Sequence, residues 1–194
     1  MFKRALFWVT VAIVVAGCVP SVRAAPRAYA IEPAHTLVSF EVRNFGIAKR
    51  RGLFDRVTGQ VSLDAQAGAG SVEIVVNARS VETSDAATRA FLRGRSFLNV
   101  ERFSQIVYRA GRMIFANEKP VRIEGELTLL GVTRSVSLSV SGYACEGGGS
   151  SASDRCVMDA ATTFKRSEFG MNHYLGLVSD EVTLSIHGVT TQAL

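Results

Sequence analysis

Residues 121–140, VRIEGELTLLGVTRSVSLSV, alternate strictly between apolar and polar side chains on either side of a short Gly-Val-Thr break. Successive side chains of a β-strand point to opposite faces of a sheet, so this pattern predicts two strands with one dry face and one wet face. The short break makes the two strands antiparallel neighbours. The side chains expected on the dry face are Val121, Ile123, Leu127, Leu129, Val136, Leu138 and Val140.

The same alternation recurs along the chain at near-regular spacing, whereas helical periodicity is rare. One interval, from Asp85 to about Arg93, predicts a short helix, because Thr-Ser-Asp capping residues precede a run of Ala, Phe and Leu. Many short strands without intervening helices are typical of an antiparallel sandwich or a closed barrel. The further strands are expected near 37–42, 57–64, 72–76, 106–109, 113–116, 157–164 and 182–189, with a turn at 65–70.

Residues 1–24 are predicted to be a secretory signal peptide. Two positive charges at the N-terminus precede an uncharged, mostly apolar run, 5–17, that is too short for a comfortable membrane span. Two processing sites remain open: cleavage after Ala24, or lipidation at Cys18, since residues 15–18 resemble a bacterial lipobox. Residues 25–194 are long enough for one well-buried core. We therefore expect a single exported domain in the periplasm, attached to a membrane only if Cys18 carries a lipid.

The charge of the chain gives little reason to expect a polyanionic partner. Removing Lys3, Arg4 and Arg23 with the signal peptide lowers the formal net charge from +5 to +2. A nearly neutral domain is weak evidence for binding to nucleic acid or to an anionic membrane. We expect no nucleic-acid partner.

Two cysteines, Cys145 and Cys156, remain after the signal peptide and flank the Gly/Ser-rich segment EGGGSSASDR. In an oxidising compartment they are expected to form a disulfide that closes a hairpin tip and contributes about 2–3 kcal/mol in the chain-entropy model. A redox centre or a metal site is the less favoured alternative, because there is no Cys-x-x-Cys spacing and no nearby histidine.

None of the three histidines lies in a metal-binding motif, and no nucleophile elbow, phosphate loop or dinucleotide fingerprint is present. His187 alternates within a predicted strand and is expected on the outer face. His35 and His173 are expected at strand or loop edges. A hydrolase would need one of these two to meet a carboxylate such as Asp180 or Glu181. We expect no catalytic activity, no metal and no cofactor.

Basic residues gather in two places. Residues 49–51, Lys-Arg-Arg, are expected in a solvated loop between the first two strands. The second cluster surrounds the predicted helix and alternates with apolar residues, which suits the mouth of a site for an amphipathic ligand with a polar head and an apolar tail. Alternatively, the aromatics simply close the end of the barrel. This cluster comprises Arg89, Phe91, Leu92, Arg93, Arg95, Phe97, Leu98, Arg102 and Phe103.

Several short motifs occur in a fixed order between Tyr29 and Val189. They are YAIE at 29–32 with Ala34, His35, Thr36 and Phe40; Phe54 with Gly59; SVET at 80–83; FLR at 91–93; Gly125 with LT at 127–128 and GVT at 131–133; and RSEFG at 166–170. As an ordered set they resemble the YceI-like family of exported lipid-binding proteins. Three positions depart from the family pattern: Asn44 and Phe91 stand where many members have histidine, and Ser96 replaces an acidic residue.

The resemblance implies a lipocalin-like antiparallel barrel of about eight strands with a helix near one end. It further implies a binding protein, monomeric or homodimeric, that carries a polyisoprenoid or an isoprenoid quinone in an apolar cavity. The competing hypothesis is a ligand-free partner-binding module in envelope stress or electron-transfer assemblies. The candidates for contact with the lipid tail are Phe40, Phe91, Leu92, Phe97, Phe103, Leu127, Leu129 and Phe169, and those for the headgroup are Arg93, Arg166 and His173.

Overall fold

The computed structural model describes residues 26–64, 67–146 and 154–193. The predicted signal peptide with both of its processing sites, the tip of the cysteine hairpin and part of the predicted turn at 65–70 lie outside these ranges. The strands are β1 Arg27–Ile31, β2 Leu37–Asn44, β3 Ala48–Phe54, β4 Val57–Asp64, β5 Ala69–Asn77, β6 Val81–Thr83, β7 Gln105–Ala116, β8 Lys119–Leu129, β9 Val132–Glu146, β10 Arg155–Lys165 and β11 Glu181–Gln192. One α-helix, α1 Ala86–Arg93, and two short 3-10 helices, η1 Ala78–Ser80 and η2 Arg166–Phe169, complete the described structure.

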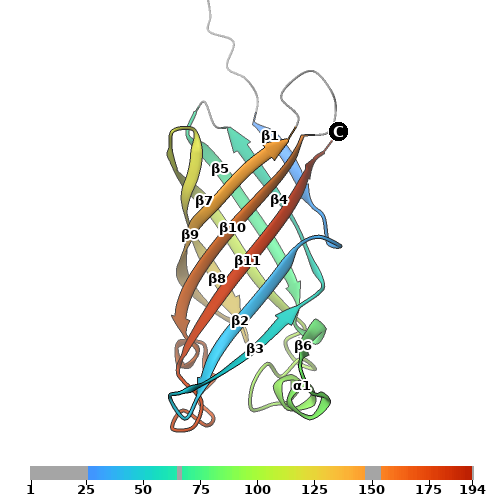
Figure 1. Ribbon diagram of the computed structural model, residues 1–194, viewed down its shortest axis with the longest axis vertical. Helices are drawn as coiled ribbons and strands as arrows, with labels where there is room; N and C mark the ends of the chain where they lie inside the picture. The colour runs from blue at the N-terminus through green and yellow to red at the C-terminus, as the bar shows by residue number, and fades with distance from the viewer. Residues whose placement is uncertain (1–25, 65–66, 147–153, 194) are drawn as a thin grey trace, which may run out of the picture.

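The strands form a closed antiparallel barrel (Figure 1). Each strand pairs with its neighbours in the order β1-β4-β5-β7-β8-β9-β10-β11, and pairing of β1 with β11 closes the ring. The strand β11 pairs with β1 near its end and with β2 near its start. From β2 the sheet continues through β3 to β6. The expected barrel of about eight strands is therefore confirmed. Closure leaves no exposed edge in the ring.

The predicted helix is confirmed as α1, and Asp85 is its N-cap. The Asp85 side chain accepts a hydrogen bond of 2.7 Å from the backbone amide of Thr88. This contact satisfies one of the amides that a helix start leaves without an intrahelical partner. No α1 residue is fully buried, so the helix lies across the lower end of the barrel in Figure 1 rather than inside it.

The alternation that predicted β8 and β9 holds except at one residue. Val121 is 40% exposed, and the prediction that it faces the interior was wrong. Pro120 pairs with Phe115 of β7. Arg122 pairs with Ile114, which leaves Val121 as an extra residue in β8. A bulge of this kind shifts the alternation by one residue, so Pro120 takes the buried position instead.

A second bulge explains why one long strand was predicted as two short ones. The runs at 106–109 and 113–116 both belong to β7, and the register shifts between Ala110 and Arg112. Gly111 is the additional residue, and it interrupts the period of two.

The half of the barrel near the termini is filled by a packed core. Tyr29 pairs with Val61, which in turn pairs with Val72, and all three are buried. On the neighbouring strands Met113 pairs with Ile123, which is completely inaccessible to solvent. This layer closes one half of the barrel, so open space is restricted to the half near α1.

The predicted disulfide between Cys145 and Cys156 is confirmed. The two residues lie directly opposite each other on β9 and β10, and their sulfur atoms are 2.02 Å apart. The bond links the two strands at the end of the barrel opposite α1 (Figure 1).

Glu32, directly after β1, joins three wall strands through its carboxylate. Arg155 of β10 donates to it at 3.1 Å, and the hydroxyl of Thr191 on β11 also donates to it. His35 lies 2.9 Å from the same carboxylate. The hydrogen bonds from Arg155 and Thr191 lower the pKa of Glu32 from 4.5 to about 2.

Acid is therefore expected to weaken the barrel partly through Glu32. A carboxyl group with a lowered folded-state pKa stabilises the fold above its unfolded value of 4.5, and this stabilisation is lost as the pH falls from 4.5 to about 2. Urea unfolding between pH 7 and pH 2 should show a smaller acid-induced loss of stability in Glu32→Gln than in the wild type. If both proteins lose the same free energy of unfolding between pH 7 and pH 2, Glu32 does not contribute to the acid sensitivity of the barrel.

Candidate functional site

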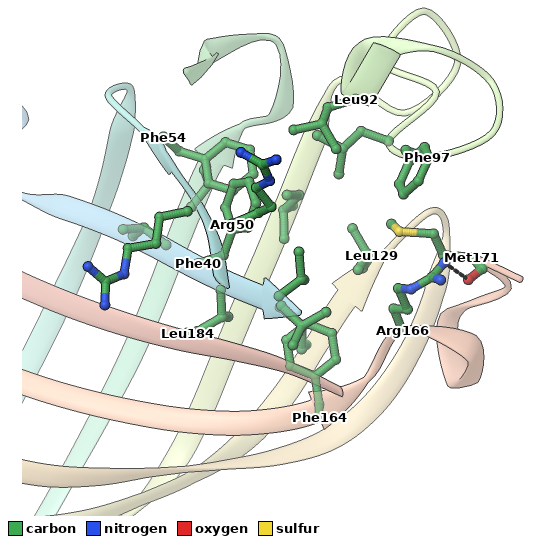
Figure 2. Close-up of a pocket in the computed structure, with 18 of the residues that line it drawn as sticks. Phe40, Arg50, Phe54, Leu92, Phe97, Leu129, Phe164, Arg166, Met171 and Leu184 are labelled. Atoms are coloured by element: carbon green, nitrogen blue, oxygen red, sulfur yellow. Dashed lines mark hydrogen bonds between the residues drawn. The ribbon is translucent and has the colours of Figure 1, made fainter. Parts of the chain in front are cut away.

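A cavity of about 440 Å³ occupies the half of the barrel near α1 (Figure 2). Inward side chains of β2, β5, β7, β8, β9, β10 and β11 form its walls. Because these walls are aliphatic and aromatic, the cavity suits an apolar ligand. The wall residues include Val38, Phe40, Ile74, Val76, Leu127, Leu129, Val136, Leu138, Phe164, Leu184 and Ile186.

Tyr108 lies where the cavity meets the packed half of the barrel. Its hydroxyl is within hydrogen-bond distance of the carbonyl oxygens of Val136, at 3.0 Å, and Ile123, at 3.2 Å. Burial raises the pKa of Tyr108 to about 12, so the side chain stays neutral. A Cβ atom on Gly125 would lie 2.8 Å from the tyrosine ring. The glycine of the sequence motif therefore makes room for the ring, and the hydroxyl is already occupied.

The helix α1 covers one side of the mouth and is held there by ion pairs. Arg89 donates to Glu82 of β6 at 2.6 Å, and Arg93 donates to the same carboxylate at 3.3 Å and to the carbonyl of Val81 at 3.2 Å. Phe91 and Leu92 of the helix line the cavity. The helix thus contributes apolar side chains to the mouth, while its arginines attach it to the wall.

Arg166 of η2 holds the opposite side of the mouth. Its guanidinium donates four hydrogen bonds to backbone carbonyls, those of Ser179 at 2.9 Å, Met171 at 2.7 Å, His173 at 2.8 Å and Val178 at 3.0 Å. The residue is 1% exposed, and burial lowers its pKa from the ordinary value for arginine. Arg166 therefore fixes the segment 171–179, which contributes Met171 and Val178 to the cavity lining.

Arg50 is a charged side chain at the mouth whose guanidinium forms no hydrogen bond or ion pair with any residue that the structure describes. Its neighbours Lys49 and Arg51 both pair with Glu41, at 3.0 and 2.8 Å, and Arg51 also contributes to the cavity lining. Arg50 pairs in register with Val42, whose side chain lines the cavity, and it lies beside Phe40 and Phe54 (Figure 2). Residues 49–51 are part of β3, so their prediction as a loop was wrong.

Six of the eight tail candidates line the cavity: Phe40, Phe91, Leu92, Phe97, Leu127 and Leu129. Phe103 is not among the lining residues. A Cβ atom on Gly131 would lie 3.0 Å from its ring, which packs against the β8–β9 turn. Phe169 is also absent from the lining: it is 1% exposed and packs edge-on against Phe164 with ring centroids 5.2 Å apart. Both residues lie outside strands, where the period of two gives no direction for a side chain.

The headgroup candidates are placed differently from the expectation. Arg166 lines the cavity, but four of its donors are bound to the protein backbone. Arg93 and His173 do not line the cavity. The arginine that the sequence reasoning missed is Arg50. Continuing the alternation of Phe54 and Gly52 backwards along the chain places it on the inner face, so the signal was present in the sequence.

None of the three histidines lines the cavity. His187 is exposed and lies 2.7 Å from Asp159 on the outer face, as expected. His35 contacts Glu32, and Asp180 accepts its hydrogen bonds from Ser167. Across residues 26–64, 67–146 and 154–193, neither Asp180 nor Glu181 bonds to a histidine, and His, Cys, Asp and Glu side chains form no cluster of three or more that could hold a metal ion. Over the same residues, no helix has the length and apolar character needed to cross a membrane.

The fold and the cavity together define a lipocalin-like barrel with an apolar cavity. A family model for the YceI-like domain matches residues 29–190, and the chain belongs to this family. A UPF0312 protein of Yersinia pestis (strain Pestoides F) is 32% identical over 161 residues, which cover 81% of this chain and 83% of the relative.

Two solved structures share the fold. The crystal structure of Burkholderia cenocepacia BcnA has a TM-score of 0.67 at 21% identity and covers 82% of this chain and 98% of its own. A structure described as a polyisoprenoid binding domain from Saccharophagus degradans has a TM-score of 0.63 at 15% identity, with coverage of 87% and 99%. At these identities the likeness establishes the architecture alone.

Proposed function

We propose that the protein is an exported binding protein that holds the tail of an isoprenoid-type lipid, a polyisoprenoid or an isoprenoid quinone, in the barrel cavity. The observation that carries the proposal is the apolar cavity of about 440 Å³ in a barrel whose other half is solidly packed. The polyisoprenoid binding described for the Saccharophagus degradans relative supports this class of ligand. The disulfide supports export, because such bonds persist in oxidising compartments.

The distribution of polar groups sets the orientation of the ligand. Away from the mouth, the polar side chains that line the cavity are Tyr108, whose hydroxyl is already hydrogen-bonded, and Thr162 on β10. The mouth carries Asn44, Arg50, Thr83, Asp85 and Thr88. The lipid tail therefore enters first, and when the whole tail fits inside the cavity, the headgroup remains at the mouth beside Arg50. A fully packed interior would favour the ligand-free alternative, so the cavity supports the carrier proposal instead.

The volume of the cavity limits how much of a tail it holds. A methylene group takes up about as much space as a water molecule, roughly 30 Å³. The cavity of about 440 Å³ therefore accommodates about 15 carbon atoms, or about three isoprene units. The rest of a longer tail must extend through the mouth.

A chain-length series tests the proposal. The affinity of the lipid-free protein is expected to rise by about a hundredfold or more from geraniol to farnesol. Each added methylene that is buried contributes about 0.8 kcal/mol to the binding free energy. From farnesol to geranylgeraniol the increase should be much smaller, since the additional isoprene unit lies outside the cavity. Displacement of a fluorescent lipid measures both steps. Absence of binding at every length, or an undiminished increase beyond farnesol, would contradict the proposal.

A further inference from the structure

Most of the exposed large hydrophobic side chains of the described structure gather at the mouth of the cavity. The members of this rim patch are Phe45, Ile47, Phe91, Tyr174, Leu175 and Leu177, and their exposed fractions range from 41% to 86%. Among the described residues, Leu37 and Val121 are the exposed large hydrophobics outside the patch. Single exposed apolar residues are ordinary on protein surfaces, whereas a contiguous group marks an interaction site.

Three segments that are distant in sequence form the patch as one surface. The backbone amide of Phe45, in the β2–β3 turn, donates to the carbonyl of Leu177 at 2.7 Å. The rings of Phe91 on α1 and Tyr174 lie with centroids 5.6 Å apart. In Figure 1 the β2–β3 turn, the segment before β11 and α1 all lie at the lower end of the barrel. The apolar surface therefore surrounds the opening of the cavity.

The backbone of the β2–β3 turn exposes its apolar residues. Phe45 adopts a φ of 52°, an uncommon conformation for a bulky residue, and Gly46 follows with a φ of 74°. Ile47 is 86% exposed, the highest value among the large hydrophobic side chains described. Packing of the barrel does not account for an isoleucine at this position.

Positive charge accompanies the patch. The β2–β3 hairpin from residue 41 to residue 51 contains Arg43, Lys49, Arg50 and Arg51 but a single acidic residue, Glu41. On the other side, α1 and the residue pair after it contribute Arg89 and Arg93, which share the carboxylate of Glu82, and Arg95, which forms no ion pair among the described residues. Exposed apolar residues flanked by arginine and lysine are the pattern that binds an anionic lipid bilayer, since apolar side chains enter the interface and cations contact the lipid phosphates.

We propose that the rim patch docks the barrel, mouth first, on an anionic lipid bilayer. The cavity opens inside the patch, and Phe91 belongs to both, so a docked protein places its cavity directly against the membrane. A lipid then passes between bilayer and barrel without exposing its tail to water. This transfer step rests on the proposed lipid-binding function, whereas docking itself does not.

Co-sedimentation with vesicles tests the docking. All proteins carry Cys18→Ser in the full chain, so that a lipid attached at this residue cannot cause binding. The wild-type patch is expected to bind vesicles of phosphatidylcholine containing about one third phosphatidylglycerol, and binding should fall at least about tenfold with phosphatidylcholine alone or at high salt. Phe45→Ser/Ile47→Ser is expected to lose at least about tenfold in binding to the anionic vesicles.

The matched control replaces the exposed hydrophobics outside the patch, Leu37→Ser/Val121→Ser, and should bind vesicles like the wild type. Docking is overturned by failure of the wild type to bind anionic vesicles, by equal losses in the two double variants, or by a rim variant that only converts a dimer of this chain into monomers. Farnesol binding is measured in parallel. Vesicle binding without farnesol binding leaves docking supported and contradicts the lipid-carrier function instead.

Discussion

Replacing Arg166 with methionine is expected to lower the free energy of unfolding by about 3–5 kcal/mol. Methionine keeps an apolar stem of similar length but removes the donors to four backbone carbonyls, those of Met171, His173, Val178 and Ser179. Each buried carbonyl that is left without a partner loses a hydrogen bond from a charged donor and is not fully compensated by water. Urea unfolding gives the size of the loss.

The same substitution at Arg50 is the matched control. The Arg50 guanidinium has no hydrogen-bond or ion-pair partner among the described residues, so Arg50→Met should change the stability by less than about 0.5 kcal/mol. Limited proteolysis should further show earlier cleavage within 171–179 in Arg166→Met, because the released segment opens locally. If both variants unfold at the same urea concentration as the wild type, Arg166 does not hold the mouth together.

Replacing Leu184 with tryptophan is expected to abolish most lipid binding while leaving the barrel folded. Leu184 points into the cavity from β11, beside Phe40 of the neighbouring strand β2, and is only half-buried, because open space lies in front of it (Figure 2). The larger side chain displaces about four methylene groups of a bound tail. At about 0.8 kcal/mol each, their loss lowers the affinity by about 3 kcal/mol, or about a hundredfold.

Leu37→Trp is the control for this variant. Leu37 lies on β2, which is paired with β11, but its side chain points outward and is 40% exposed. The Leu37→Trp variant should bind farnesol with wild-type affinity. Both tryptophan variants should unfold within about 1 kcal/mol of the wild type, since neither forces a side chain into a filled core. Unchanged farnesol binding by Leu184→Trp would place the tail elsewhere.

The helix and the strands β2, β4, β5 and β7 to β11 could be predicted because their signals are local, whereas β1, β3 and β6 were missed. The period of two identified β8, β9 and the alternating part of β7, and Asp85 marked the start of α1. Two cysteines that remain after the signal peptide were enough to predict their disulfide. The ordered motifs from Tyr29 to Val189 matched the family whose model covers residues 29–190.

The errors occurred where one residue changes the register or where a side chain lies outside a strand. The bulge at Val121 reverses the side of the sheet that this residue faces, and an unbroken alternating pattern gives no sign of it. Phe103 was predicted from the basic and aromatic cluster around the helix, and Phe169 belongs to the RSEFG motif, but neither lines the cavity. Lys49, Arg50 and Arg51 form a strand although basic residues at this density resemble a solvated loop, because pairing with β2 decides their conformation.

The sequence by itself determined that this chain forms antiparallel strands with one dry face, a capped helix and a cross-linked hairpin, since these follow from interactions between residues close in the chain or from a simple period. Tertiary structure alone decided what the dry face encloses. Alternation is the same for a packed core and for a cavity, and the difference depends on whether side chains from opposite walls meet across the barrel. Near Tyr29 and Ile123 they meet. Near Leu184 and Phe40 they leave the space in which we place the lipid.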